Sequence, residues 1–241
     1  MIKNNRATYP EILLLFYSHL ITSSIIKNKI EISDFNAYYF GTVFPDIRYL
    51  LKLPRHYTHL PSDEVLDYIT EFEKDKNFLI GYYLHCVLDE LDLPALISGK
   101  IPAKLLQGIL SHKVKTVLLE YYFRDNYPSD IEILPVANGI TEELNISRES
   151  LVNYVDLLNQ YLKTDSLHQV VNTLENLGIS RFGSVEKYLS AAEFVEKHEH
   201  IRHLLFSVLE IKTLESEITT FLEHKGVFKK LADTGIIKLK T

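Results

Sequence analysis

Residues 10–27 read PEILLLFYSHLITSSIIK, and the spacing of their apolar side chains is that of an α-helix. Pro10 suits the first turn, because the amide hydrogen that proline lacks has no partner there in any case. The apolar side chains recur three or four positions apart, at Ile12, Leu15, Phe16, Leu20 and Ile21. This periodicity predicts a buried helix that ends near Lys27.

The same periodicity continues along the rest of the chain. Ser33 or Asp34 caps a short helix through Tyr39, and Gly41 and Pro45 are expected to end it. Further helices are expected at residues 62–73, 76–98, 102–124, 147–163, 166–177, 184–195 and 197–223, with a loop at 126–138 and a tail or single edge strand at 236–241. Within this series, caps or breaks are expected at Pro94, Pro102, Ser147, Gly178 and Gly226. No repeat interrupts the pattern, so residues 1–241 are predicted to form a single all-α domain, a bundle of many helices.

Composition excludes several classes of protein. The 241 residues hold 26 Lys and Arg against 32 Asp and Glu, a formal net charge of −6 that argues against a broad nucleic-acid surface. One cysteine cannot form an internal disulfide. No uncharged apolar run reaches about 18 residues, so no transmembrane segment is expected. The first apolar run is not followed by a small-residue cleavage site, which favours a cytoplasmic protein.

The most informative polar spacing is His85-Cys86-Val87-Leu88-Asp89. Residues four apart lie on one face of a helix, so His85 and Asp89 can bind one cation together. The helix before them is almost wholly apolar, and an unpaired carboxylate is costly to bury there. The alternative is a structural pair in which His85 and Asp89 hydrogen-bond to each other.

Other chemistry-bearing residues accompany this pair in the first half of the chain. Asp46 ends the apolar segment Gly-Thr-Val-Phe-Pro-Asp, and His19 lies within the apolar first helix. The segment Arg55-His56-Tyr57-Thr58-His59 supplies two imidazoles, and we expect it to be a loop. A second histidine cluster, at residues 198–203, is dense in charge and is typical of a solvated helix face.

The ordered set resembles the zinc-dependent phospholipase C and P1 nuclease family. It comprises His19, then Phe-Gly-Thr-Val-Phe-Pro-Asp46, Thr-His59 and Gly-Tyr-Tyr-Leu-His85-x-x-x-Asp89, and it covers residues 12–98. Members of that family are all-α, bind up to three zinc ions through His and Asp side chains, and cleave phosphodiester bonds. The resemblance implies an all-α bundle of the same type in this chain.

The resemblance also implies roles for individual residues. Asp46, His59, His85 and Asp89 would form one metal site, and His19 would belong to a neighbouring site that shares one aspartate. One or two zinc ions are expected, although other divalent metals would also suit these ligands. Asp46, Arg55 and His56 are assigned to catalysis. Arg48, Arg55 or His56 is expected to bind the substrate phosphate, because these residues lie near the proposed ligands in the sequence.

The chain departs from the family pattern in three places. Secreted members use their mature N-terminal residue as a ligand, whereas eighteen residues precede His19 here. Leu93 stands where the family has a histidine after the H-x-x-x-D motif. The family's later H-x-x-x-E is absent, because His112 is followed four residues on by Thr116, with Glu120 one turn further. A third metal is therefore not expected.

Together these features predict a metal-dependent hydrolase of small phosphoric esters that uses a metal-activated water. The alternative is a non-catalytic helical protein that holds a structural metal or a buried His/Asp network and acts as an interaction module. Residues 141–235 are helical, with no assigned role. The sequence does not distinguish between lipid, nucleotide and other phosphate esters, and it does not indicate an oligomeric state.

Overall fold

The computed structural model describes residues 16–91, 112–126, 131–164, 167–177, 185–208, 211–235 and 237–240. Within these ranges the fold is all-α, as predicted, and the β interaction is an isolated antiparallel bridge between Ile30 and Leu239. The helices in chain order are α1 (Phe16–Ile26), α2 (Phe35–Val43), η1 (Phe44–Asp46), α3 (Ile47–Leu51), α4 (Arg55–Thr58), α5 (Ser62–Glu71), η2 (Glu73–Asp75), α6 (Lys76–Leu88), α9 (His112–Asn126), α10 (Gly139–Glu143), α11 (Arg148–Lys163), α12 (Leu167–Asn176), α13 (Val185–Lys197), α14 (Glu199–Val208), α15 (Ile211–His224) and α16 (Val227–Asp233).

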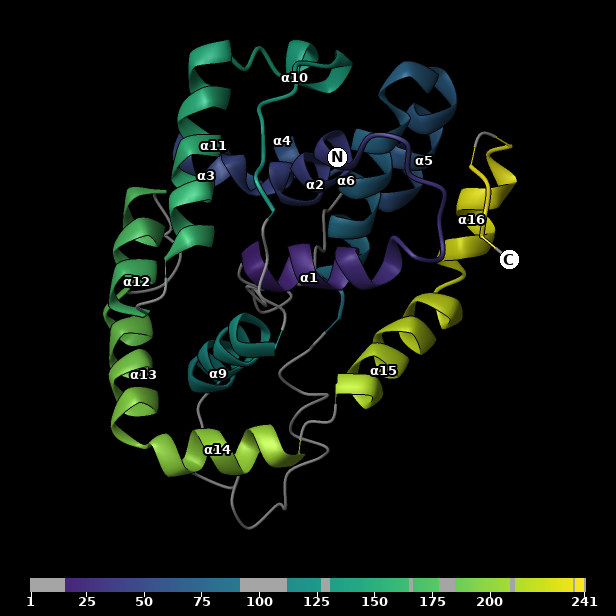
Figure 1. Ribbon diagram of the computed structural model, residues 1–241. Helices are drawn as coiled ribbons and strands as arrows, with labels where there is room; N and C mark the ends of the chain where they lie inside the picture. Colours follow the sequence, from purple (N-terminus) through teal and green to yellow (C-terminus); the bar gives the residue numbers. More distant parts are fainter. Residues whose placement is uncertain are drawn as a thin grey trace, which may run out of the picture.

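Helix α1 crosses the middle of the molecule (Figure 1). It contacts α2, α6, α9 and α15. Apart from His19, its side chains are apolar or small on every face, and nearly all of them are buried. A helix without a polar face is stable only when neighbours cover it on all sides, so α1 forms the centre of the core.

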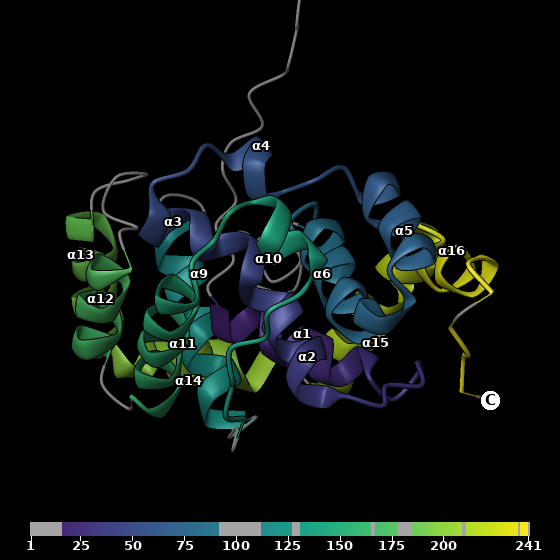
Figure 2. The same cartoon turned by 90° about the horizontal axis from the view of Figure 1, so that it is seen from above.

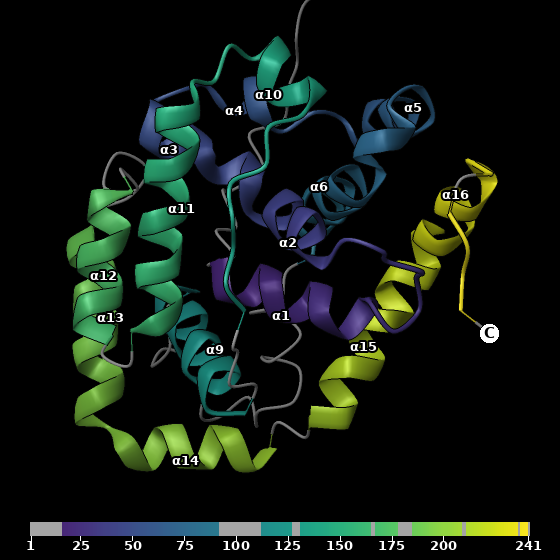
Figure 3. The same cartoon turned by 45° about the horizontal axis from the view of Figure 1, so that its top comes forward.

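The C-terminal helices enclose this centre. Figures 1 and 3 show α13, α14, α15 and α16 forming an arc around α9 and α1, in which α13 contacts α9 and α15 contacts α1. Seen from above, α12 and α13 lie at one end of the molecule and α5 with α16 at the other (Figure 2). Helix α11 is amphipathic, and it buries Tyr154, Leu158 and Tyr161 at helical spacing.

Helices α2 and α6 approach each other closely through two glycines. A Cβ atom on Gly41 would lie 2.0 Å from the carbonyl oxygen of Phe78, and one on Gly81 would lie 2.0 Å from that of Tyr38. The prediction that Gly41 ends its helix is wrong, because α2 continues to Val43. Gly41 allows the close contact between the helices, and Pro45 is the second residue of the 3-10 turn η1 that follows.

Several other boundaries differ from those expected. Helix α6 ends at Leu88, well before Pro94, and residues 197–223 form two helices, α14 and α15. Residues 55–58 form the short helix α4 where we expected a loop. The expected features at Pro10, Pro94, Pro102 and Gly178 lie outside the described residues.

The predicted caps at Asp34 and Ser147 are confirmed, since each side chain accepts a hydrogen bond from the first turn of its helix. Gly226 separates α15 from α16, as predicted, and its φ of +66° is in the left-handed region. None of the described helices is long and apolar enough to span a membrane.

Candidate metal centre

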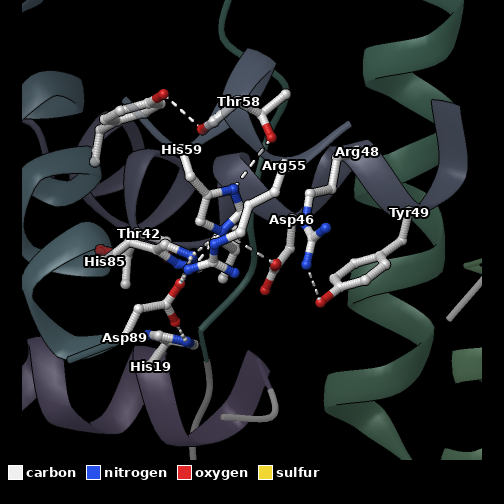
Figure 4. A network of polar contacts seen from close by, with 12 residues as sticks. His19, Thr42, Asp46, Arg48, Tyr49, Arg55, Thr58, His59, His85 and Asp89 are labelled. Carbon is white, nitrogen blue, oxygen red and sulfur yellow. Dashed lines mark hydrogen bonds and ion pairs between the residues drawn. The ribbon is translucent and has the colours of Figure 1, made fainter. Parts of the chain in front are cut away.

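The five predicted ligands come together at one place in the fold (Figure 4). They come from separate elements: His19 from α1, Asp46 from η1, His59 from the residue after α4, His85 from α6 and Asp89 from its C-cap. Packing of α1 and η1 against α6, and of α4 against η1, therefore builds the cluster from four segments of the chain.

Asp89 lies at the centre of the cluster. Its Oδ1 atom is 3.4 Å from His19 Nε2, and its Oδ2 atom is 3.3 Å from His59 Nε2 and 3.6 Å from His85 Nε2. Although α6 ends at Leu88, the C-cap residue keeps right-handed helical angles (φ −61°, ψ −18°). The predicted placement of His85 and Asp89 on one face is therefore confirmed.

The ring of His85 is held in one tautomer. Its Nδ1 atom lies 2.8 Å from the carbonyl oxygen of Thr42, and because a carbonyl only accepts, Nδ1 carries the hydrogen. In the neutral ring the lone pair is then on Nε2, which faces the cluster. Burial lowers the pKa of His85 well below its usual value, so this neutral form is favoured.

His59 is arranged in a similar way. Its Nδ1 atom lies 3.2 Å from Thr58 Oγ1, and its Nε2 atom lies 3.2 Å from Nε2 of His85. Burial lowers the pKa of His59 to about 4. Two neutral imidazoles thus direct their Nε2 atoms at one point beside a carboxylate, and outer hydrogen bonds of this kind orient histidines in metal sites.

The two carboxyl groups are in different electrostatic environments. Burial, together with repulsion from Asp89, raises the pKa of Asp46 to about 7. Burial also disfavours the charge on Asp89, but its contacts with His85, His19 and His59 outweigh that effect and hold its pKa well below the usual range. Asp46 reaches the cluster through His59, whose Nε2 atom is 3.7 Å from Asp46 Oδ1.

The three residues proposed for phosphate binding are placed differently. Arg55 Nη2 donates to Asp89 Oδ2, and the Arg55 side chain is 43% exposed. Arg48 is fully buried, donates to the hydroxyl of Tyr49 at 2.6 Å and lies over its ring. His56 is exposed, with its ring against Tyr57, and the structure does not bring it into the cluster. Arg55 is thus the candidate that is both at the cluster and open to solvent.

Sequence reasoning did not find the residues that orient the ligands. Thr42 and Thr58 hold the two imidazoles, and the hydroxyl of Tyr82 donates to the Thr58 carbonyl at 2.5 Å, which ties α4 to α6. Thr58 directly precedes a ligand in the sequence, so its position was a usable signal. A backbone carbonyl such as that of Thr42 leaves no such signal.

The donor set fits a divalent metal. Two groups have candidate ligand atoms within 4.8 Å of one another, namely His19, His85 and Asp89, and Asp46, His59 and His85. Mixed imidazole and carboxylate ligands suit zinc. His19 Nδ1 is buried and has no hydrogen-bond partner among the described residues. The other ring nitrogen of His19, Nε2, is the one that faces Asp89.

Other candidate ligands lie away from this cluster or outside the described residues. Glu120 is buried on α9, where it accepts hydrogen bonds from Arg124 Nε at 3.1 Å and from the Tyr161 hydroxyl. Leu93 lies outside the described residues, as does the side chain of His112.

In the second histidine cluster His200 and His203 are exposed, as expected for a solvated helix face, whereas His198 is partly buried, with its Nδ1 atom 2.8 Å from the Phe194 carbonyl oxygen. His203 Nε2 is 3.5 Å from Glu199 Oε1, and both side chains are 68% exposed.

Comparison of the chain with protein-family models, with curated proteins and with solved structures finds no match.

Proposed function

We propose that this protein is a metal-dependent hydrolase of phosphoric esters, similar in type to the zinc-dependent phospholipase C and P1 nuclease family. One observation carries the proposal. The Nε2 atoms of His59 and His85 lie 3.2 Å apart beside the Asp89 carboxylate, and each ring is oriented through its Nδ1 atom. Such an arrangement is suited to one or two divalent cations, with zinc the best match to the ligand types.

A bound zinc ion would supply Lewis acidity toward a phosphoryl oxygen and a coordinated water of lowered pKa. The protein residues have separate tasks around it. Thr42 and Thr58 fix the imidazoles, so that no reorganisation is needed during the reaction. Asp46 would complete the ligand set beside His59 and His85. Arg55 is accessible to solvent and presents a planar guanidinium suited to a phosphate.

Metal content is the first test. The protein is loaded with zinc, desalted and measured by elemental analysis, and we expect at least one molar equivalent. His85→Ala should retain much less, whereas His203→Ala, which alters an exposed histidine of the other cluster, should retain the wild-type amount. Less than one equivalent in the wild type, or unchanged retention in His85→Ala, would contradict the metal centre.

Hydrolysis is the second test. The zinc-loaded protein is assayed on bis(p-nitrophenyl) phosphate, on phosphatidylcholine vesicles and on single-stranded oligonucleotides. We expect cleavage of at least one of these substrates, lost after chelation and in Asp46→Asn. No cleavage of any of them by protein that holds its metal would refute the hydrolase.

The burial of the cluster favours a second candidate function. The side chains of His19 and His85 are at most 1% exposed, and those of His59 and Asp46 are below 10%. A buried cation can serve to hold the fold together, in a non-catalytic helical protein. Retained zinc, no hydrolysis, and a large loss of stability after chelation would together favour this candidate.

A further inference from the structure

Arg55 occupies the carboxylate oxygen on which the proposed metal ligands converge. Its Nη2 atom donates to Oδ2 of Asp89. The same oxygen is 3.3 Å from His59 Nε2 and 3.6 Å from His85 Nε2. In Figure 4 the guanidinium accordingly lies among the imidazoles and the carboxylate.

A guanidinium and a metal ion at this position are competitors. Both are cations and both use the negative charge of Asp89, and like charges within a few ångströms repel strongly where water is scarce. The Asp89 side chain is 9% exposed, so the repulsion is weakly screened. A cation bound by His59, His85 and Asp89 therefore weakens the hold of Arg55 on the carboxylate.

Arg55 is able to leave without disturbing the fold. It is the first residue of the four-residue helix α4, and its side chain is 43% exposed. Arg48 offers a contrast, because its fully buried guanidinium is held by Tyr49. The guanidinium of Arg48 is thus fixed in the core, whereas that of Arg55 has room to move into solvent.

We propose that Arg55 is a displaceable counter-ion: it neutralises Asp89 in the metal-free protein, and metal binding releases it to bind the phosphate group of the substrate. The inference rests on the proposed function, since it concerns the same metal centre. It makes metal and phosphate binding cooperative, and each ligand must strengthen the other by the same factor.

Zinc affinity tests the competition directly. Wild type, Arg55→Gln, Arg55→Lys and Lys52→Gln are titrated against a chromogenic zinc chelator at pH 7. Arg55→Gln should bind zinc about ten-fold more tightly than wild type, because the competing cation is gone. Arg55→Lys, which keeps the charge, should stay near wild type. Lys52→Gln removes one exposed positive charge three residues away, and it should also stay near wild type.

Binding of inorganic phosphate tests the release. Calorimetric titration of the zinc-loaded proteins should show about ten-fold weaker phosphate binding in Arg55→Gln than in wild type and Lys52→Gln. A third measurement needs no variant. In wild-type protein labelled with 15N-arginine, zinc should shift the guanidinium resonance of Arg55 and leave that of Arg124, which is paired with Glu120 on α9, almost unchanged.

These outcomes separate the inference from the hydrolase proposal. Tighter zinc binding by Arg55→Gln with no hydrolysis by any protein supports the counter-ion role and refutes the hydrolase. Hydrolysis by wild type with equal or weaker zinc binding by Arg55→Gln overturns the counter-ion role alone. An Arg55 resonance that does not respond to zinc overturns it as well, and so does failure of the wild type to bind zinc.

Discussion

Replacement of Gly41 by alanine tests how closely the candidate metal centre depends on the packing of α2 against α6. The added Cβ atom would lie 2.0 Å from the carbonyl oxygen and 2.9 Å from the carbonyl carbon of Phe78. Ordinary contacts begin near 3.4 Å. Both atoms belong to the backbone and cannot rotate away, so the two helices must separate by more than an ångström.

The energetic cost follows from this geometry. Overpacking a core costs about 1–3 kcal/mol, and a clash with backbone belongs at the upper end or above it. Alanine recovers about 1 kcal/mol of helix propensity, which leaves a net loss of about 2 kcal/mol or more. For a chain of this size, that loss lowers Tm by about 4–8 °C.

The same separation affects the ligands. Thr42 follows Gly41 on α2, and its carbonyl holds His85 at 2.8 Å across the helix contact. If that hydrogen bond is lost, zinc affinity should fall about ten- to a hundred-fold, as it does when outer-sphere partners of ligating histidines are removed. Gly41→Ala is therefore expected to lower stability and zinc affinity together.

Gly139→Ala provides the matched control. There the new Cβ atom would lie 3.4 Å from Phe72 Cδ1, an ordinary contact, at the first residue of α10. For both variants, Tm is measured by thermal unfolding monitored with circular dichroism, and zinc affinity is measured by titration against a chelator. If Gly41→Ala retains the Tm and the zinc affinity of Gly139→Ala, the inferred link between helix packing and metal binding is refuted.

Three further predictions concern single side chains. Thr58→Val should weaken zinc binding about ten-fold with little change in Tm, because Nδ1 of His59 loses its partner; an unchanged affinity would contradict the orienting role. Zinc affinity should fall about ten-fold per pH unit below about 7, because Asp46 then holds a proton that the metal must displace; a flat profile between pH 5 and 7 would argue against Asp46 as a ligand. Glu120→Leu should reduce the free energy of unfolding in urea by about 3 kcal/mol, because Arg124 is left buried without its carboxylate; Glu199→Leu, at an exposed pair, should change it little.

The sequence was sufficient where the determining contacts are local. His85 and Asp89 are one helical turn apart, so their spacing alone places them on one face. Asp34 and Ser147 are recognisable as caps because the groups that they bind lie within three residues. The all-α class follows from a periodicity that each helix carries in its own residues.

It was insufficient where the contacts are between distant segments. Gly41 was interpreted as a helix end, because a glycine that ends a helix and one that admits another helix look alike locally. The pairing of Arg55 with Asp89 joins residues 34 positions apart, and it depends on how α4 is held against α6. The burial of Glu120 beside Arg124 at the i,i+4 spacing was open to prediction, but its partner Tyr161 was not.

The origin of the ligands determines which experiment can identify the function. His19, Asp46, His59 and His85 come from four different segments, three of which also contribute residues to the core, so a bound cation would hold those segments together whether or not it catalyses a reaction. A loss of stability after chelation is therefore expected for an enzyme as well as for a structural metal protein. The two functions separate on a different property, which is whether a substrate phosphate can reach the cluster. The side chain of Arg55, which is paired with Asp89, is 43% exposed. Release of Arg55 from Asp89 would open a path for phosphate to the cluster. Phosphate binding by the zinc-loaded protein thus discriminates between the two functions more directly than stability does.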